Sequence, residues 1–481
     1  MKEVLLIFPG QPGYEEKKHI PLGILYIAGP LVKEGYKVKI LDERIEDYKK
    51  LDYNRYLCVG ISAQTGKQIL HGLKIAKYIK EKNPKIKLIW GGVHPSILPE
   101  STINNRYVDI IVLGDGELTF HKLVKAIEKG EYISKINGIV YKDNKKIIHN
   151  PIKEYLDLDK LDLPPYELLD LNKYYYKEYF AINTSRGCPH RCSFCCVKEK
   201  WRARSAEKVI EDIEKIVKKY NPELISFVDN NFFCSKERVR KFCELKIKKK
   251  INIGWSTLSR LDYFAGYDDE FVSLLKKSGC KSVLFGAESG NQRILDLMKK
   301  DIRVGDIVKS LELCKKHDIL PIMSFMIGNL TEKKEEVFET LRFIDELFKI
   351  NPKLDITGIF IFSPWPGTDL FEEVVRLGLK KPETLEEWGR FNMGESSHNP
   401  YIPFRYRRMY KTVQMVSRFR FLKPDFEFDR VSKRHKRLPF FKEVAYRFLT
   451  WSAQKRWKYK FFKFGFEFDI YALYMSRFGR F

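Results

Sequence analysis

The stretch FAINTSRGCPHRCSFC, residues 180–195, places a short β-rich run directly before three closely spaced cysteines, Cys188, Cys192 and Cys195. The cysteines stand four and three residues apart on a segment that also carries Gly, Pro and Arg. Three thiolates at this spacing on one loop can converge on a soft metal centre. A tetrahedral zinc site normally takes four protein ligands in two separated pairs, and no matching pair follows downstream. A [4Fe–4S] cluster with three protein thiolates leaves one iron open, so the pattern favours a catalytic iron–sulfur metal site.

Two other interpretations of these cysteines stay open. They could be buried core residues, or they could form a zinc knuckle completed by His190 or Cys196. The cysteines outside the cluster are interpreted as ordinary semi-buried thiols: Cys58, Cys196, Cys234, Cys243, Cys280 and Cys314.

Outward from this stretch, toward the C-terminus, β-rich runs alternate with segments of helical periodicity. Six such units predict a full or partial (βα)6 barrel over residues 180–375, with its active site at the C-terminal ends of the strands. The predicted strands are Tyr179–Asn183, Leu224–Val228, Ile253–Thr257, Ser282–Phe285, Pro321–Met326 and Thr357–Ile361.

Toward the N-terminus, residues 1–150 show the same alternation and predict a Rossmann-like, doubly wound parallel α/β sheet. Residues 151–179 read as an irregular linker, and residues 376–481 as a basic, aromatic and mostly helical region. The strands predicted in the first domain are Lys2–Phe8, Lys37–Leu41, Tyr56–Ser62, Lys87–Trp90 and Asp109–Leu113.

The cysteine motif, with an aromatic residue before its third cysteine, resembles the radical S-adenosylmethionine (SAM) enzymes. Four further motifs at predicted strand ends extend the resemblance: FVDNNF (227–232), FGAESG (285–290), FMIGN (325–329) and SPWPGT (363–368). The resemblance implies that the amino and carboxylate groups of SAM chelate the open iron. Phe194 would then lie against the adenine, Asp229 and Asn230 would face the methionyl ammonium, and Glu288 with Ser289 would face the ribose. Arg260 could pair with the methionyl carboxylate as a fork. Taken singly, an acidic residue that ends a strand is more often a helix cap.

Glycine-containing loops also follow the strands predicted in residues 1–150. Glycines at the carboxyl edge of such a sheet let the backbone approach a large flat ligand, although turn glycines without a ligand are the alternative. Together with the cysteines, this order looks like the cobalamin-binding branch of the radical SAM enzymes, over roughly residues 1–375. The motif Asp-x-His-x-x-Gly is missing, so no lower-axial histidine of the methylmalonyl-mutase kind is available. A loop histidine such as His94 is more often a hydrogen-bonding residue than a ligand. The residues implied to contact cobalamin are Leu22, Gly23, Ser62, Gln64, Thr65, Gly91, Gly92, His94, Gly114, Gly116 and Glu117.

Composition narrows the classes of protein that fit. The 481 residues suffice for two or three domains, and the net charge is +25. No apolar run approaches the length of a membrane span, and the N-terminus lacks the features of a signal peptide. Nine cysteines, an odd number, agree with a reducing cytoplasm. We therefore expect a cytoplasmic protein, and the resemblance to radical SAM enzymes implies that it is oxygen-sensitive.

Residues 401–481 hold 21 of the basic residues, 6 of the acidic ones and 24 of the 67 aromatics. Such a region could bind nucleic acid, could lie on anionic lipid, or could be a helical cap with solvated charges. The predominance of Phe favours lipid, and thus peripheral contact with the inner face of the membrane, and makes nucleic acid unlikely.

The resemblance implies a cobalamin-dependent radical SAM C-methyltransferase acting on an unactivated sp³ carbon of a lipid or another hydrophobic small molecule. The family's reaction proceeds through a 5′-deoxyadenosyl radical and methylcobalamin, with electrons from an external donor such as flavodoxin or ferredoxin. The alternatives are the same radical start with cyclisation, oxidation or C–C bond formation, and a non-catalytic cobalamin or cluster sensor with a basic tail.

Overall fold

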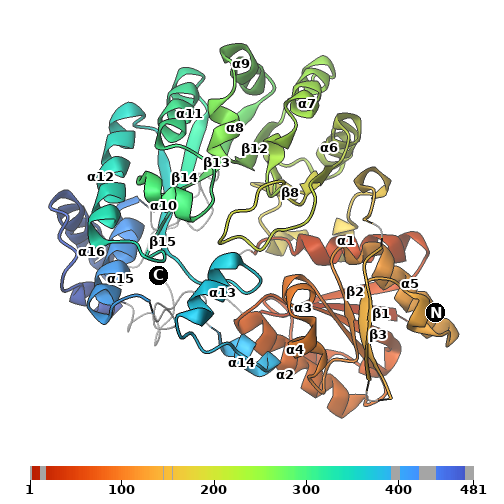
Figure 1. Ribbon diagram of the computed structural model, residues 1–481. Helices are drawn as coiled ribbons and strands as arrows, with labels where there is room; N and C mark the ends of the chain where they lie inside the picture. Colours follow the sequence, from red (N-terminus) through yellow and green to blue (C-terminus); the bar gives the residue numbers. More distant parts are fainter. Residues whose placement is uncertain are drawn as a thin grey trace. The chain divides into compact units, whose positions relative to one another are not determined.

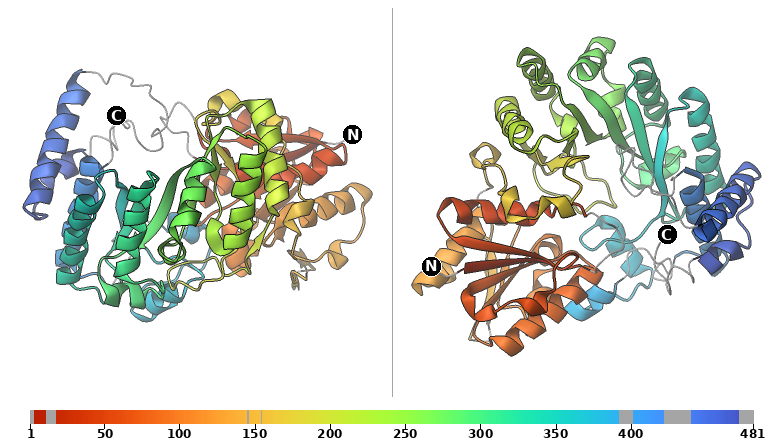
Figure 2. Two further views of the ribbon diagram at one scale, coloured as in Figure 1. Left: turned by 90° about the horizontal axis from the view of Figure 1, so that it is seen from above. Right: turned by 180° about the vertical axis from the view of Figure 1, so that it is seen from behind.

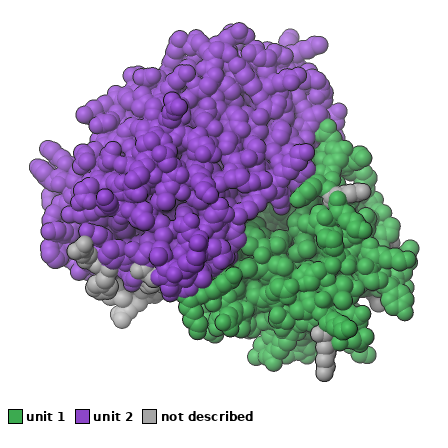
Figure 3. Space-filling model, viewed as in Figure 1, with its two compact units in different colours: residues 1–176, 380–393 green, residues 177–379, 394–481 purple. Residues whose placement is uncertain are grey.

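The computed structural model describes residues 3–10, 18–144, 146–153, 155–391, 401–421 and 440–471. The chain forms two compact units, coloured separately in Figure 3. Unit 1 contains residues 1–176 and 380–393, and unit 2 contains residues 177–379 and 394–481. The chain therefore contributes to unit 1 twice, at its beginning and again after the strands of unit 2.

Unit 1 is built on a seven-stranded sheet with the order β2-β1-β3-β4-β5-β6-β7. The first five strands pair in parallel and the last two are antiparallel. The antiparallel hairpin β6–β7 was not predicted, because its outer strand is short and mostly polar, which gives no continuous apolar run. The strands are β1 (Glu3–Phe8), β2 (Lys37–Asp42), β3 (Tyr56–Ser62), β4 (Lys87–Gly91), β5 (Ile110–Val112), β6 (Ile139–Asp143) and β7 (Lys146–Asn150).

Helices cover both faces of this sheet. Helices α1 and α5 pack together on one face, and α2 and α14 pack together on the other (Figure 2). The helices of unit 1 are α1 (Leu22–Lys33), α2 (Lys67–Lys82), α3 (Val93–Ile97), α4 (Pro99–Ile103), α5 (Gly116–Lys129) and α14 (Leu385–Arg390). The segment that precedes unit 2 contains three short 3₁₀ helices, Leu158–Lys160, Tyr166–Leu168 and Leu171–Lys173.

Unit 2 contains a six-stranded, all-parallel sheet with the order β15-β14-β13-β12-β11-β8. Its two end strands do not pair with each other, so the sheet is a partial barrel, and helices α6, α7, α9, α11 and α12 form an arc on its outer side (Figure 1). The fold class predicted from the sequence is confirmed. The strands are β8 (Phe180–Ile182), β11 (Leu224–Phe227), β12 (Gly254–Ser259), β13 (Cys280–Glu288), β14 (Leu320–Ile327) and β15 (Asp355–Ile361). The helices are α6 (Ala206–Tyr220), α7 (Lys236–Lys248), α8 (Leu261–Ala265), α9 (Asp269–Lys277), α10 (Gln292–Leu297), α11 (Val304–Lys316), α12 (Lys334–Ile350) and α13 (Asp369–Arg376).

A buried aromatic cluster fixes the second and third strands of the barrel against their helices. Phe227 at the end of β11 stacks on Phe232 with ring centroids 4.7 Å apart and meets Phe242 of α7 edge-on. Trp255 of β12 completes the cluster. Such pairs add about 0.5–1.5 kcal/mol each beyond their buried area. The loop after β11, which carries Asp229 and Asn230, therefore starts from a rigid support.

Two long helices follow the barrel, α15 (Phe404–Phe421) and α16 (Phe440–Lys458). Helix α15 packs against the end strand β15, and α16 packs against α15. Trp457 of α16 is buried and donates from Nε1 to Asp345 Oδ1 of α12 at 2.6 Å, so part of the aromatic region caps the barrel. Among the described residues, no helix combines the length and apolarity that a membrane crossing requires.

Candidate functional site

The three-cysteine loop is closed at its base by a two-stranded antiparallel ladder that the sequence analysis missed. Strand β9 (Ser185–Arg186) pairs with β10 (Arg202–Ala203), and the amide of Cys188 donates to Glu199 O at 3.1 Å. Gly187 lies between the ladder and the first cysteine with φ +75°, and a Cβ there would stand 2.7 Å from Glu199 O. A side chain at this position would push the two arms of the loop apart.

The middle of the loop is anchored by Ser193, which is buried between the second and third cysteines. Its amide donates to Met298 O at 2.8 Å, its hydroxyl donates to Leu297 O at 3.2 Å, and its carbonyl accepts from Leu370 N at 3.0 Å. The loop is thereby fixed to the ends of α10 and α13. Burial raises the pKa of the Cys192 and Cys195 thiols, so a positively charged centre is needed to hold them as thiolates.

The donor set suits a cluster better than a single ion. Within the described residues, no three His, Cys, Asp or Glu side chains gather closely enough to hold one metal ion. In an iron–sulfur cluster each thiolate binds its own iron, so the sulfurs stand farther apart. His190, the candidate fourth zinc ligand, has its Nε2 3.0 Å from the Tyr263 hydroxyl. The chemistry of three cysteines on one anchored loop therefore fits a cluster, which Cys188, Cys192 and Cys195 would hold.

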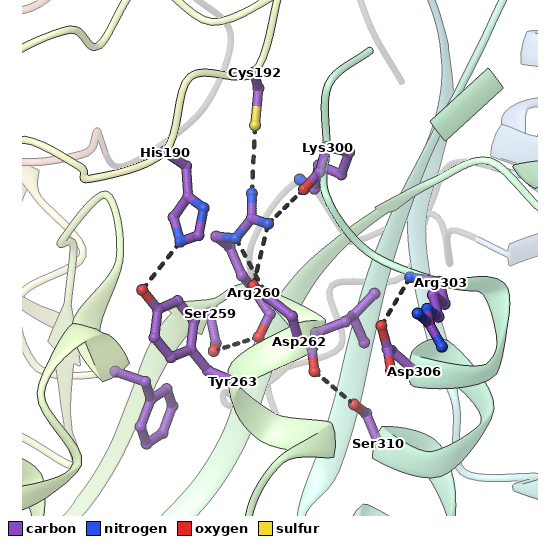
Figure 4. Close-up of polar contacts among 12 residues, drawn as sticks. His190, Cys192, Ser259, Arg260, Asp262, Tyr263, Lys300, Arg303, Asp306 and Ser310 are labelled. Carbon is purple, nitrogen blue, oxygen red and sulfur yellow. Dashed lines mark hydrogen bonds and ion pairs between the residues drawn. The ribbon is translucent and has the colours of Figure 1, made fainter. Parts of the chain in front are cut away.

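Arg260, at the end of β12, connects the cysteine loop to the barrel (Figure 4). Its Nη1 lies 3.4 Å from the Cys192 sulfur, and its Nε and Nη2 donate to the two carboxylate oxygens of Asp262 at 3.0 and 3.2 Å. Nη2 also donates to the backbone carbonyl of Lys300. The guanidinium is buried, so its position is fixed by these partners.

Lys300 joins three of the predicted site residues. Its Nζ donates to Glu288 Oε1 at 2.9 Å and lies 5.6 Å from the centre of the Phe194 ring. Glu288 ends β13 with φ +63°, a conformation that non-glycine residues adopt infrequently. Both charged groups are nearly buried. Phe194, Glu288 and Arg260 are therefore brought to one place at the carboxyl ends of the strands.

The polar residues of the loop after β11 differ in their burial and in their hydrogen bonds. The Asp229 carboxylate is buried and accepts from Thr184 N and Oγ1 at 2.6 Å each and from Ser185 Oγ at 2.7 Å, which ties β11 to the end of β8. Asn230 is exposed. Asn231 is fully buried, and both polar atoms of its side chain lack a hydrogen-bond partner within the described structure. Asn231 was not singled out from the sequence.

Ser289, next to Glu288, is fully buried. Its hydroxyl lies 3.1 Å from the Thr340 hydroxyl of α12 and accepts from the Asn291 amide at 3.1 Å.

The assignment of Asp229, Asn230, Arg260, Glu288 and Ser289 to individual groups of SAM stays a prediction. The unsatisfied amide of Asn231 is a polar group of the kind that a bound ligand completes.

In unit 1, the residues predicted to contact cobalamin follow β1, β3, β4 and β5. Because these strands are parallel, their carboxyl ends meet at one edge of the sheet, where ligands of such folds bind. Leu22 and Gly23 begin α1, Ser62 and Gly91 end strands, and Gly116 and Glu117 begin α5. The loop residues are Gln64, Thr65, Gly92 and Gly114, and His94 lies in α3.

His94 is fully buried at this edge. Its Nδ1 lies 2.9 Å from Thr65 Oγ1, and its Nε2 has no hydrogen-bond partner among the described residues. Burial lowers the pKa of His94 to about 4, so the imidazole is neutral at pH 7. The Trp388 ring of α14 meets the imidazole edge-on at 5.7 Å, and the Trp388 carbonyl accepts from Gly66 N at 3.1 Å.

Two glycines at the same edge differ in the space around them. Gly92 has φ +100°, and a Cβ there would stand 2.9 Å from Ala63 O. Gly23 has open space where a Cβ would be. An edge with open space at Gly23, a close backbone approach at Gly92 and an unsatisfied buried imidazole nitrogen fits a large polar-rimmed ligand such as cobalamin, which Gly23, Thr65 and Gly92 would border.

Sequence reasoning missed Lys300, Tyr263 and Trp388. Each is brought to its site by tertiary packing from a distant part of the chain, and none belongs to a recognisable local motif. The alternation of strands and helices predicts which residues lie at the carboxyl edge of a sheet, but it does not specify which side chain from a distant part of the chain packs beside them.

Comparison with known proteins agrees with this geometry. The radical SAM superfamily model matches residues 182–344, and the B12 binding domain model matches residues 16–124. An uncharacterised methyltransferase of Pyrococcus horikoshii is 33% identical over 370 residues, which cover 74% of this chain and 78% of that protein. The anaerobic magnesium-protoporphyrin IX monomethyl ester cyclase of Rubrivivax gelatinosus is 28% identical over 374 residues, covering 74% of this chain and 66% of the cyclase.

The cobalamin-dependent S-adenosylmethionine radical enzyme OxsB, solved with aqua-cobalamin and S-adenosylmethionine bound, has the same fold. It matches with a TM-score of 0.73 at 17% identity, over 99% of this chain and 75% of its own. The protein is thus an enzyme whose cofactors are a [4Fe–4S] cluster, SAM and cobalamin. With its three-cysteine loop, its partial barrel and its B12-binding domain, this chain belongs to the cobalamin-binding radical SAM enzymes.

Proposed function

We propose that the protein transfers a methyl group to an unactivated sp³ carbon of a hydrophobic small molecule. The observation that carries the proposal is the occurrence, in one chain, of the anchored three-cysteine loop and the B12-binding domain, with 33% identity to a relative named as a methyltransferase. We assign cobalamin to residues 1–150, the cluster and SAM to residues 180–375, and substrate contacts to residues 376–481.

When bound, the cluster and SAM supply a radical that removes hydrogen from an unreactive carbon, and cobalamin supplies the methyl group. The chain's own residues bind and orient these groups. Cys188, Cys192 and Cys195 would hold three irons of the cluster, and the Arg260 guanidinium beside the Cys192 sulfur would stabilise the negative charge of that thiolate. Lys300 places a second cation between Glu288 and the Phe194 ring.

Exclusion of water is the second contribution of these residues. Arg260, Lys300 and Glu288 are all nearly buried and hydrogen-bonded to one another or to Asp262. In such an environment charge interactions are stronger than in water, and a reactive intermediate is protected from solvent. An electron from an external donor of the flavodoxin or ferredoxin type is required.

A second candidate is radical cyclisation on the same scaffold. The identity of 28% to a monomethyl ester cyclase favours it, because motifs that start a radical do not determine how the radical ends. The two reactions can be distinguished by the carbon content of the product, because methyl transfer incorporates a carbon from SAM into the substrate and cyclisation does not.

The test uses protein purified without oxygen and supplied with cobalamin. With a chemical reductant, the wild-type enzyme is expected to contain iron and cobalamin, cleave SAM, and transfer isotopically labelled methyl groups into an extract of hydrophobic metabolites. Cys192→Ala should lose iron and SAM cleavage, whereas Cys196→Ala, the matched control, should keep both. SAM cleavage without incorporation of label would favour cyclisation, and retention of cleavage in Cys192→Ala would contradict the site.

A further inference from the structure

Helix α16 carries two apolar faces, of which one is exposed. Leu449, Ala453 and Trp457 are buried against the rest of unit 2. Another side of the helix carries Val444, Phe448, Trp451 and Lys455 at helical spacing, and all four are exposed. Tyr459, directly after the helix, continues the spacing and is exposed too. The Trp451 side chain is 56% exposed and its ring stacks on Phe448 with centroids 6.1 Å apart. A helix on the surface of a globular protein needs one apolar stripe, which faces the core, so packing within unit 2 does not explain the second, exposed stripe.

The segment after α16 repeats this division. Phe462 and Phe468 are buried, while the nearby apolar residues Phe461, Phe464, Phe466 and Ile470 are exposed. Arg456 of α16 fixes this segment to the helix, because its guanidinium donates to Lys463 O at 2.8 Å and Phe464 O at 3.0 Å. We call the exposed apolar residues of helix and segment the aromatic face: Val444, Phe448, Trp451, Tyr459, Phe461, Phe464, Phe466 and Ile470.

Charge on this part of the chain has one predominant sign. Residues 444–471 contain six basic and two acidic residues. Of the acidic pair, Glu467 is buried and bonded to Arg456 and Ser452, and Asp469 is paired with Arg408 at 3.1 Å. Lys455, Lys458 and Lys463 are exposed. Exposed cations therefore alternate along the chain with the residues of the aromatic face.

We propose that the aromatic face is a docking surface for an anionic lipid bilayer. Aromatic and aliphatic side chains enter the headgroup region, and nearby lysines are attracted to anionic headgroups. A second copy of this chain fits less well, because a symmetric contact would bring like charges together. Nucleic acid fits less well, because Val444 and Ile470 offer no ring on which a base could stack.

Docking at a bilayer would bring the enzyme to hydrophobic substrates dissolved there, which adds a location to the function proposed above. The docking itself does not depend on the reaction, and vesicle binding is measured without turnover. Failure of one proposal is therefore distinguishable from failure of the other.

The experiment is flotation of the full-length protein with vesicles of phosphatidylcholine alone or mixed with phosphatidylglycerol. We expect binding to the mixed vesicles and a blue shift of tryptophan fluorescence. Phe448→Ser with Trp451→Ser should abolish flotation. Lys455→Gln with Lys463→Gln should weaken binding about 25-fold, at about fivefold for each lysine near the surface. Tyr132→Ser, which changes an exposed aromatic residue of unit 1, is the matched control and should leave binding unchanged.

Because the substituted side chains are exposed, all variants should unfold at the wild-type temperature and cleave SAM at the wild-type rate. Absence of wild-type binding to the mixed vesicles would overturn the proposal. Unchanged binding by the Phe448→Ser, Trp451→Ser variant would also overturn it, as would dimerisation through this face or retention by nucleic acid without vesicle binding.

Discussion

The guanidinium of Arg260 lies 3.4 Å from the sulfur of Cys192, although the two residues are 68 positions apart in the chain. The contact joins the end of β12 to the middle of the cysteine loop. It also places a fixed positive charge at one thiol of the cluster site, held by the Asp262 carboxylate.

Replacing Arg260 with Lys is expected to loosen the cluster, because an ammonium group cannot reach Asp262, the Lys300 carbonyl and the Cys192 sulfur together. Loss of such a supporting contact typically weakens metal binding about 10- to 100-fold. The rate of iron release to a chelator, measured without oxygen, should rise accordingly. Arg240→Lys, which alters a surface pair with Glu270, should leave the rate unchanged.

Gly187→Ala should prevent assembly of the cluster while leaving the rest of unit 2 folded. The backbone φ of +75° and the approach of Glu199 O leave no room for a methyl group. Iron content after reconstitution is the measurement. Gly305→Ala is the control, since a Cβ there meets nothing within 4 Å, and it should bind iron normally. Equal iron content in the two variants would show that the β9–β10 ladder does not determine the conformation of the cysteine loop.

Lys300→Met should destabilise the apoprotein by about 3 kcal/mol, because it leaves the nearly buried Glu288 carboxylate without its partner. Adding Glu288→Gln removes the uncompensated charge, so the double variant should be more stable than Lys300→Met alone. Urea unfolding followed by tryptophan fluorescence measures both. Strictly additive losses in the two single variants and the double variant would mean that the ion pair is not coupled.

His94 should make the apoprotein less stable in acid. Burial lowers its pKa from 6.5 to about 4, so as the pH falls through this interval the unfolded chain takes up a proton before the folded one. Stability from this group is therefore complete above pH 6.5 and falls by about 3 kcal/mol on the way to pH 4. The loss between neutral and acidic pH, from urea unfolding, should be smaller in His94→Gln by this amount. An identical loss in the two proteins would contradict a buried neutral imidazole.

Most strands of the two sheets could be predicted from the chain, although their order could not, and the reason is visible in particular strands. β3 and β4 are short continuous apolar runs, as expected for central strands of a parallel sheet that is covered on both faces. The hairpin β6–β7 and the ladder β9–β10 lack that signal. The hairpin forms at the edge of a sheet and the ladder closes a loop, and neither situation requires a periodic pattern of apolar residues in the sequence.

The sequence by itself determined three features: the spacing of the three cysteines, the order of strands and helices along the chain, and the residues at which the predicted strands end. It could do so because covalent spacing and apolar periodicity are local properties of the chain. Tertiary structure decided which partners those residues meet. Asp229 is committed to Thr184 and Ser185, and Lys300 stands between Glu288 and Phe194. Such contacts depend on how distant elements pack, because that packing decides which polar groups come within hydrogen-bonding distance of one another.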